Sequence, residues 1–404
     1  MKRGEIMMNN NENNPLKNRH ETLFLWDVRK SNPNGDPNGN EPRIDRYTNK
    51  CDVMDVCIKR SVRNFVSIVN GPNSILINKL GNDSSETVTL TNRISDYLFG
   101  TPEQIEKTTK IVKRIVEDQL KEDKQYKQFL EDPSPKTLDG IINSKSKKDL
   151  EKIVSNESVN VEALQNTIIA ELRAYLCCMF NDLRMFGSIL ALENDLKALG
   201  GPITGPIQIE IGTSCHRVVQ SNKQITSVMS SSEEKEAGII GDTHCIEYGL
   251  FATSAIANEN AARFTGLTED DQYLFLKALW RGTRERHTRS KNQVPRLLVD
   301  IEYNKPFHFG DLVNNIKLIP KMNVKNGKLI EEESYRSIED FSIDLTSFFQ
   351  KVNSKKDIIN NIKFFSYDLI SLKNFKEKLD TELAGKVTEV NDLDIDSPKE
   401  SKQE

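Results

Sequence analysis

The stretch ETLFLWDVRKSNPNGDPNGN, residues 21–40, contains a predicted strand followed by a loop rich in turn-forming residues. Glu21 to Val28 is dominated by large apolar residues and predicts a strand. The run Asn32 to Asn40 combines Asn-Gly and Pro-Asn pairs, which are typical of turns. Helical spacing of apolar residues then predicts a helix from Asp52 to Val66. A glycine-rich loop leading into a basic helix suits a phosphate backbone. An ordinary connecting loop before a solvated helix face is the alternative.

Composition indicates a sizeable core and a large solvated surface. The chain has 404 residues, of which 37% are hydrophobic and 29% are charged. No window approaches about 18 uncharged apolar residues, so no transmembrane helix is expected. Lys2 and Arg3 are not followed by an apolar segment, so no signal peptide is expected either. The six cysteines form no C-x-x-C pair and no zinc-finger spacing, which predicts reduced thiols in the cytoplasm.

The net charge of −4 does not by itself favour a nucleic-acid partner. Its distribution is uneven along the chain. The last 25 residues hold eight acids and three bases, whereas Arg281 to Arg296 holds six bases and one acid. Binding to phosphates requires a local basic stripe rather than a basic average. The composition therefore leaves a nucleic-acid partner open.

Hydrophobic periodicity predicts the remaining elements. Residues 70–160 are rich in Lys, Glu, Asp, Asn and Ser and predict a helical insertion, with one helix from Pro102 to about Leu130. Further predictions are helices at 161–180 and 268–282 and strands at 207–211, 244–257 and 294–303. Without the insertion, the order is β-α-β-β-α-β. This is the ferredoxin-like arrangement of RNA-recognition (RRM) modules, so we expect an α+β fold with an RRM-like palm.

The expected domain plan places the palm at residues 19–69 and 161–310, with the insertion at 70–160 between its parts. Within the palm, the polar and serine-rich residues 220–242 link two strands. A C-terminal α/β extension is expected at 311–379. Residues 1–18 and the acidic residues 380–404 are expected to be disordered tails.

Four basic regions are expected to bind RNA through phosphate and sugar rather than through base identity. They are the 32–40 loop with Arg43 and Arg46, the first helix, residues 182–187, and residues 281–291. Arginine suits this role because its planar fork donates two hydrogen bonds at once. Each region alone is more often a solvated face. The candidate RNA-binding residues in these regions are Asn32, Asn34, Arg43, Lys59, Arg60, Arg63, Arg184, Arg281, Arg284, Arg289 and Lys291, to which His216 is added.

Several motifs resemble the backbone subunit of type I CRISPR interference complexes (Cascade), a member of the RAMP superfamily of RNA-binding proteins. The similarity is closest to subtype I-B, with I-C next. The motifs that carry it are FLWDVRKSNPNGDPNGNEPRID (24–45), DVCIKRSVRNFV (55–66), DLRMFG (182–187), GPIQIEIG (205–212), ALWRGTRERHTRSK (278–291) and PRLLVDIEY (295–303).

The resemblance implies an RRM-like palm with a helical finger-like insertion and a protruding thumb, here at about 220–242. It implies copies that polymerise head to tail along CRISPR RNA, kink it with their thumbs, and leave bases free to pair with target DNA. Met229 is the candidate wedge residue, with packing against a neighbouring subunit as the alternative. The implied partners are further copies of the chain, a large subunit, a cap subunit and a guide-processing endonuclease. No cofactor and no catalytic residue are implied.

A nuclease is the main alternative, because related RAMP backbone subunits of type III complexes cut RNA with a loop aspartate. Metal-dependent hydrolysis usually requires clustered carboxylates. The candidates are Asp36, Glu41, Asp45, Asp52 and Asp55, whose spacing matches no metal motif. A nucleotide-binding enzyme is less consistent with the sequence, which contains neither a G-x-x-x-x-G-K-[ST] nor a G-x-G-x-x-G motif. If the protein is a structural scaffold without RNA contact, charge reversal at Lys59, Arg60 and Arg63 should leave assembly intact.

Overall fold

The computed structural model describes residues 15–78, 89–116, 124–142, 161–226, 240–288, 290–324, 326–366 and 370–390. Their contacts divide the chain into two compact units. The sheet unit comprises Lys17–Val66, Ile207–Glu259 and Gln272–Glu404, and the helical unit comprises Met1–Leu16, Ser67–Pro206 and Asn260–Asp271. Among the described helices, none has the length and apolar character needed to span a membrane.

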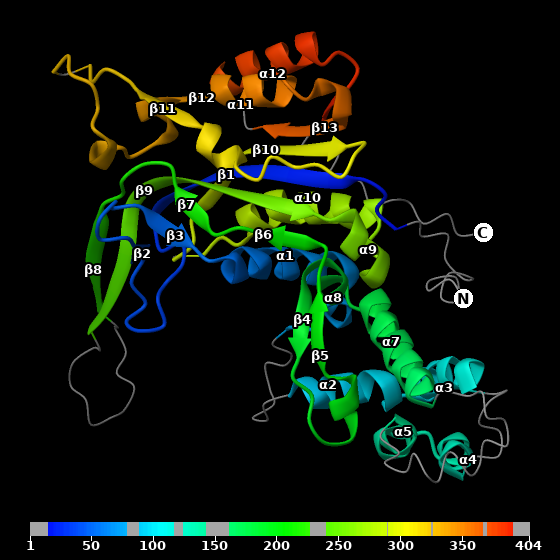
Figure 1. Ribbon diagram of the computed structural model, residues 1–404. Helices are drawn as coiled ribbons and strands as arrows, with labels where there is room; N and C mark the ends of the chain where they lie inside the picture. The colour runs from blue at the N-terminus through cyan, green and yellow to red at the C-terminus, as the bar shows by residue number, and fades with distance from the viewer. Residues whose placement is uncertain are drawn as a thin grey trace, which may run out of the picture. The chain divides into compact units, whose positions relative to one another are not determined.

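A large mixed sheet forms the centre of the sheet unit (Figure 1). Its strands run in the order β14-β13-β10-β1-β9-β7-β3-β2, and β6 and β8 also pair with β9. Every pair is antiparallel except β13 with β14. The bounds are β1 Arg19–Ser31, β2 Arg43–Ile44, β3 Cys51–Val53, β6 Ile207–Ile209, β7 Gly212–Ser214, β8 Gln220–Thr226, β9 Ile240–Ala257, β10 Gln293–Tyr303, β13 Ile359–Ser366 and β14 Val387–Glu389.

Strand β1 lies in the middle of the sheet and is covered on both faces. Leu23 and Leu25 join a core cluster on one face, whereas Phe24 and Trp26 line a small pocket on the other. A strand that is buried on both faces forms a near-continuous apolar run, which accounts for the composition of this stretch. The strand predicted from Glu21 to Val28 is confirmed and extends from Arg19 to Ser31.

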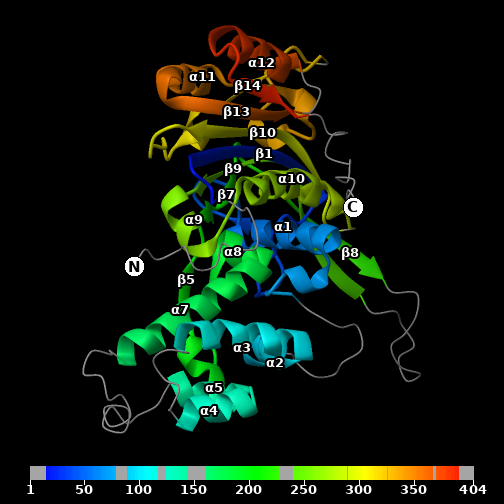
Figure 2. The same cartoon turned by 90° about the vertical axis from the view of Figure 1, so that its right-hand side faces the viewer.

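Helices α1 (Asp55–Asn70) and α10 (Glu269–Glu285) cover the face that carries Phe24 and Trp26 (Figure 2). The two helices approach each other closely at Gly282. A Cβ atom at this position would lie 2.6 Å from the backbone oxygen of Ser61 and 3.1 Å from the Cβ of Phe65. The helix pair therefore depends on the absence of a side chain at Gly282.

Gly282→Ala is expected to lower the free energy of unfolding by about 1–3 kcal/mol, because the added methyl group must push α1 and α10 apart. The matched control is Gly140→Ala in helix α5 (Pro135–Ile142). A Cβ there would meet no atom within 4 Å, so the better helix propensity of alanine should stabilise the chain by up to about 1 kcal/mol. Thermal and denaturant unfolding followed by circular dichroism would measure both effects. Equal effects at the two glycines would contradict the close helix contact.

The C-terminal segment covers the opposite face of the sheet. Strands β11 (Lys317–Pro320) and β12 (Phe341–Asp344) form a separate pair, and helices α11 (Thr346–Asn353) and α12 (Ile370–Glu382) lie over β13 (Figure 1). Buried residues of this segment share one core with Leu23 and Leu25, and they include Phe341, Phe348, Leu372 and Leu379. This face of the sheet is therefore filled by the chain itself and does not form an open platform.

Buried charged residues on β1 are hydrogen-bonded to partners far away in the sequence. Glu21 accepts hydrogen bonds from the Tyr303 hydroxyl at 2.8 Å and from two backbone N–H groups of the segment after β10. Asp27 accepts two hydrogen bonds from Arg296, at 2.9 and 2.7 Å, and one from Tyr248. A buried charge is tolerated only when it is paired in this way, so these contacts fix β1 relative to its neighbours.

The helical unit is built around a core of its own. Its helices are α2 Leu90–Phe99, α3 Pro102–Val116, α4 Lys124–Glu131, α5 Pro135–Ile142, α7 Val161–Met179 and α8 Asn181–Phe186, followed by the hairpin of β4 Gly187–Leu190 and β5 Gly201–Thr204. Helix α9, Glu259–Thr265, crosses from one unit to the other along the chain. Leu164, Ile168 and Leu172 of α7 are buried in this core, together with residues of α2, α3 and α5.

The DLRMFG motif has a structural role in the helical unit. The carboxylate of Asp182 accepts hydrogen bonds from the backbone N–H groups of Leu76 and Ile77, at 2.7 and 3.0 Å. A Cβ atom at Gly187 would lie 2.0 Å from the backbone oxygen of Ile203, and one at Gly205 would lie 2.0 Å from the carbonyl carbon of Phe186. The two glycines therefore allow the chain segments before β4 and after β5 to touch.

The predicted α+β class is confirmed, and several boundaries differ from the prediction. The compact helical unit continues to Pro206, whereas the insertion was expected to end at residue 160, because the apolar stripe of α7 packs against the helices of the insertion. The single helix expected from Pro102 to Leu130 contains the separate segments α3 and α4, and residues 117–123 lie outside the described part. The helix predicted at 268–282 and the strand predicted at 294–303 are confirmed as α10 and β10.

The described part of the chain includes residues of both expected tails. Leu16, which was placed in the N-terminal tail, is 1% exposed and donates its backbone N–H to Leu267, so it is part of the packed structure. At the other end, Leu379 and Leu383 are buried, and β14 adds a parallel strand to β13. Leu383 therefore belongs to the same core as Leu379, although it was placed in the acidic tail.

Candidate nucleic-acid interface

The loop after β1 is held by its own hydrogen bonds. The Asn32 side chain donates to the backbone oxygen of Asn40 at 2.7 Å, and the N–H of Asp36 donates to Glu41 at 2.8 Å. The Asp36 carboxylate accepts from the N–H of Asn38 at 2.7 Å, as expected for a residue that shapes a turn. The N–H groups of Asn32, Asp36, Asn38 and Asn40 are thus engaged within the sheet unit, and the loop presents fewer open N–H groups than its composition suggested.

The base of this loop is fixed to α1 and to the segment after α10. Asn34 accepts a hydrogen bond from the N–H of Met54, directly before α1, at 2.8 Å. Lys291 donates to the carbonyl oxygens of Asn32 and Pro33, each at 2.6 Å. Burial lowers the pKa of Lys291 to about 8, and the positive charge of Arg286 contributes in the same direction. Three of the four basic regions predicted from the sequence therefore meet in the sheet unit.

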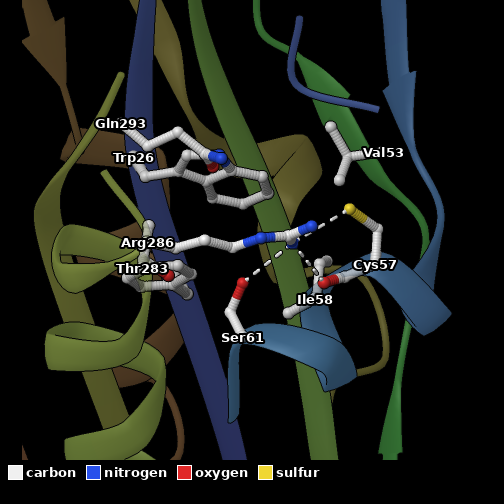
Figure 3. Close-up of a pocket in the computed structure, with 9 residues that line it drawn as sticks. Trp26, Val53, Cys57, Ile58, Ser61, Thr283, Arg286 and Gln293 are labelled. Carbon is white, nitrogen blue, oxygen red and sulfur yellow. Dashed lines mark hydrogen bonds between the residues drawn. The ribbon is translucent and has the colours of Figure 1, made fainter. Parts of the chain in front are cut away.

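Arg286 connects the same segments beneath Trp26. Its guanidinium donates to the backbone oxygen of Cys57 at 3.2 Å and to the hydroxyl of Ser61 at 3.3 Å (Figure 3). Figure 3 shows the side chain running under the Trp26 ring toward α1. Arg286 therefore joins the end of α10 to α1, and its donors are directed into the protein.

The remaining predicted cations on α1 and α10 differ in whether their side chains interact with other residues of the chain. Lys59 forms an ion pair with Asp55 at 2.8 Å, and Arg281 forms one with Glu285 at 3.0 Å. Arg63 and Arg284 are half-buried and also have interactions within the chain. Arg60 is exposed, and its side chain has no hydrogen-bond or ion-pair partner among the described residues. It lies one turn along α1 from Cys57, whose thiol faces the carbonyl of Pro33 at 3.6 Å. Arg60 is therefore the cation of α1 best placed to meet a ligand at the loop.

Arg43, on β2, borders the same loop. Its guanidinium lies 3.6 Å from the carboxylate of Asp36, and its side chain is 30% exposed. This is a weak, partly solvated ion pair, which a phosphate group can replace.

Two other predicted residues have structural partners. Arg184, in the helical unit, pairs with Asp271 at 2.7 Å and donates to the carbonyls of Cys177 and Cys178. His216 is 1% exposed, accepts from the N–H of Leu250 and lies within hydrogen-bonding distance of the Arg217 carbonyl. Burial lowers the pKa of His216, consistent with a neutral ring in the core. Neither side chain is presented to a ligand in this conformation. Met229 and Arg289 lie outside the described residues.

The predicted thumb corresponds in its described part to the arms of the β8–β9 hairpin, and residues 227–239 lie outside the described part. The base of this hairpin borders the loop. His244 of β9 lies 3.8 Å from Glu41 and 2.9 Å from Asn222 of β8. On the other side, Val218 donates its N–H to the backbone oxygen of Asn49 at 2.9 Å. The loop, the turn at residues 45–50 and the hairpin base thus form one continuous surface of the sheet unit.

The carboxylates considered for a metal site do not form one within the described residues, where no three His, Cys, Asp or Glu side chains gather in a suitable group. Asp52 accepts a hydrogen bond from Thr213, and Asp55 pairs with Lys59. The carboxylate of Asp45 accepts three hydrogen bonds from Tyr47 and Thr48, which lower its pKa. These acids shape turns and helix ends and are not arranged around a shared centre.

Comparison with known proteins identifies the family. Residues 18–346 match the family model described as CRISPR-associated protein Cas7. The chain belongs to the Cas7 family. A curated relative, the CRISPR-associated protein Cas7 of Haloferax volcanii, is 25% identical over 364 residues, which cover 85% of this chain and 86% of the relative. The Cas7 match includes the loop, α1, the hairpin and Lys291, and it ends before α12.

Solved structures with similarity to this Cas7-family chain include two from CRISPR RNA-guided surveillance complexes. One, in a pre-nicking state, has a TM-score of 0.46 and 13% identity, and the similarity covers 94% of this chain and 98% of the other. The second has a TM-score of 0.41 and 12% identity, covering 94% and 97%. The resemblance predicted from the sequence is confirmed at the level of the Cas7 family.

Proposed function

We propose that this Cas7-family protein is the CRISPR RNA-binding backbone subunit of a type I Cascade complex, most similar to subtype I-B. The observation that carries the proposal is the family match across the surface formed by the 32–42 loop, α1 and the β8–β9 hairpin base. The protein has no catalytic role in this proposal. Copies assemble head to tail along the guide RNA, which pairs with target DNA. Such a filament requires a heterologous contact that does not close into a ring.

The order of the central strands supports an RRM-like palm. The path β10-β1-β9-β7, with α1 and α10 as the connecting helices on one face, is the order of a ferredoxin-like β-α-β-β-α-β unit. In ordinary RNA-recognition modules, the opposite sheet face stacks bases on aromatic side chains. Here the C-terminal segment fills that face. RNA is therefore expected along the loop and hairpin edge, where contacts to phosphates leave the bases available for pairing.

The partners proposed from the family are the guide RNA, target DNA through that guide, further copies of the chain, a large subunit, a cap subunit and a guide-processing endonuclease. The thumb tip, with Met229 as its wedge, and Arg289 remain predictions. Of the predicted RNA-binding residues, Arg43 and Arg60 are the ones proposed to contact phosphate directly, and Lys291 is proposed to act by holding the loop. Asn32 and Asn34 contribute by shaping the loop.

A gel-shift experiment with a labelled CRISPR RNA tests this proposal. We expect a ladder of shifted species with intact RNA, both with and without Mg²⁺, and binding that weakens steeply with salt. Arg60→Glu should weaken binding several-fold and reduce the salt slope by about 0.7, the value for one phosphate on a single strand. The matched control is Lys317→Glu. Lys317 lies on β11, in the C-terminal segment that covers the other face of the sheet, so this variant should bind RNA like the parent protein.

Two results would overturn the proposal. Mg²⁺-dependent cleavage that is lost in Asp36→Ala would favour an endoribonuclease of the type III kind. Absence of binding at low salt, both for the protein alone and when it is assembled with partner subunits, would favour a scaffold without RNA contact.

A further inference from the structure

Tyr47 is an aromatic residue held almost completely in solvent. Its side chain is 96% exposed, whereas Trp26, Tyr248 and Tyr303 of the same sheet unit are buried. It lies in the turn between β2 and β3, whose pairing joins Arg43 to Asp52 and Ile44 to Cys51. A single exposed aromatic residue is not unusual on a protein surface, so the surroundings of Tyr47 must show whether it has a role.

The turn that carries Tyr47 is rigid. One carboxylate oxygen of Asp45 accepts from the N–H of Tyr47 at 3.0 Å, the N–H of Thr48 at 2.7 Å and the hydroxyl of Thr48 at 2.8 Å. The backbone closes the turn with hydrogen bonds from Asp45 to Lys50 and from Asn49 to Asp45, both at 2.8 Å. Asn49 adopts a φ of 54°, which asparagine tolerates well. The backbone beneath the ring is therefore fixed, and binding has to order only the two side-chain torsions of Tyr47.

The charges around the ring suit a polyanion. Arg46 is exposed and Lys50 is half-buried, and neither side chain has a hydrogen-bond or ion-pair partner among the described residues. Asp45 is the acid of the turn, and the hydrogen bonds that its carboxylate accepts shape the turn itself. An aromatic face beside unpartnered cations is the arrangement with which proteins bind single-stranded nucleic acids.

The turn also lies where the guide is expected. Asn49 accepts the hydrogen bond from Val218, two residues before β8, so the turn is fixed to the base of the β8–β9 hairpin. The sheet face that would otherwise stack bases is filled by the C-terminal segment. A base held at this edge therefore needs an aromatic partner outside the sheet, and Tyr47 is in that position.

We propose that the ring of Tyr47 stacks on a base of the bound guide RNA, while Arg46 contacts a neighbouring phosphate. This inference rests on the proposed function and adds a base-stacking residue to the same surface. Stacking on an aromatic face tolerates any base, so the contact is compatible with guides of any sequence.

Binding of CRISPR RNA across a salt series separates the two contributions. Tyr47→Ala should weaken binding about ten-fold without changing the dependence on salt, because stacking releases no counterions. Tyr47→Phe should bind like the parent protein, because the ring remains. Arg46→Ala should reduce the salt slope by about 0.7. The matched control is Phe264→Ala: Phe264 is 78% exposed and also follows an arginine, but it lies in α9 of the helical unit and should be neutral.

The same titrations distinguish failure of this inference from failure of the proposed function. RNA binding by the parent protein together with unchanged affinity in Tyr47→Ala would overturn the stacking contact alone. An equal loss of RNA affinity in Phe264→Ala would also overturn the stacking contact, because removal of any exposed aromatic ring would then weaken binding. Loss of the upper bands of the ladder with an unchanged first band would also overturn it, because Tyr47 would then contact a second copy of the chain. If the parent protein does not bind RNA, the proposed function fails first.

Discussion

Replacing Arg296 with methionine is expected to lower the free energy of unfolding by about 3–5 kcal/mol, the range for breaking a buried ion pair on one side. The side chains of Arg296 and Asp27 are 12% and 5% exposed, and their ion-pair distance is 2.7 Å. Arg296→Met leaves the Asp27 carboxylate in the centre of the sheet with the Tyr248 hydroxyl, at 3.2 Å, as its remaining described hydrogen-bond donor. Urea unfolding of the purified protein at pH 8 would measure the loss.

The effect should depend on pH in a defined direction. Burial raises the pKa of Asp27 even with Arg296 in place, and loss of the cation must raise it further. A folded-state pKa above the unfolded value means that stability from this group is present at low pH and is lost as the pH rises through the folded value. The deficit of Arg296→Met should therefore shrink between pH 8 and pH 5, as Asp27 takes up a proton.

Two variants serve as controls for this interpretation. Arg217→Met removes an arginine of the same unit that pairs with Glu332 and Glu333 but is 48% exposed, so it should cost less than about 1 kcal/mol. Asp27→Asn combined with Arg296→Met removes the unpaired charge and should recover most of the lost stability. A similar loss at Arg217 and Arg296, or no recovery in the double variant, would contradict a dominant role for the buried charge.

The sequence predicts an element correctly where the pattern that encodes it lies within one segment. The apolar run of β1 and the helical spacing of Cys57, Val62 and Phe65 are each contained in one segment, and both elements are present. The turn at Asp45 was not predicted, although its signal is local, because an aspartate followed by a threonine three residues later can close a hydrogen-bonded turn. That signal identifies a shaped turn, but only the structure shows that its aromatic residue is exposed at the base of the hairpin.

The site could not be predicted where the partner of a residue is distant in the sequence. Arg184 was expected to meet RNA, but it pairs with Asp271, 87 residues away. His216 was assigned to RNA by residue type, whereas its ring packs between Tyr248 and Tyr335 in the core. The C-terminal segment gave no sequence signal that it would fill the second face of the sheet. A residue type indicates which contacts are chemically suitable, and the tertiary fold decides which of them are made.

Lys291→Met is expected to have the largest effect on RNA binding among single substitutions in the sheet unit. Two hydrogen bonds from Lys291 hold the carbonyls of Asn32 and Pro33, and hydrogen bonds to a charged donor are worth about 1.5–3 kcal/mol each. Without them the loop loses two of its hydrogen bonds to the segment after α10, and the sheet unit loses a positive charge. Loss of even about 2 kcal/mol of loop ordering corresponds to roughly a 30-fold decrease in RNA affinity. Gel shifts would measure the affinity, and hydrogen exchange of the loop amides would report its order.

The lowered pKa of Lys291 predicts that RNA affinity and the free energy of unfolding change with pH in opposite directions. Burial lowers its pKa to about 8, whereas an unfolded lysine stays protonated to about 10.4. Between these values the unfolded chain binds more protons, so the contribution of Lys291 to stability rises with pH. Deprotonation removes a positive charge at the base of the loop, so RNA affinity should fall over the same range. Each unit by which bound RNA raises this pKa corresponds to about a ten-fold loss of affinity at high pH.

Lys291→Arg separates charge from titration, because arginine keeps its proton throughout this range. We expect it to retain more RNA binding than Lys291→Met and to lose the change in affinity centred near pH 8. The free energy of unfolding of Lys291→Arg and Lys291→Met should also lack the increase with pH that Lys291 contributes in the parent protein. A parent protein whose RNA affinity is constant from pH 7 to pH 9.5 would contradict the role of Lys291. Loop amides that exchange equally fast in the parent protein and in Lys291→Met would show that other contacts order the loop.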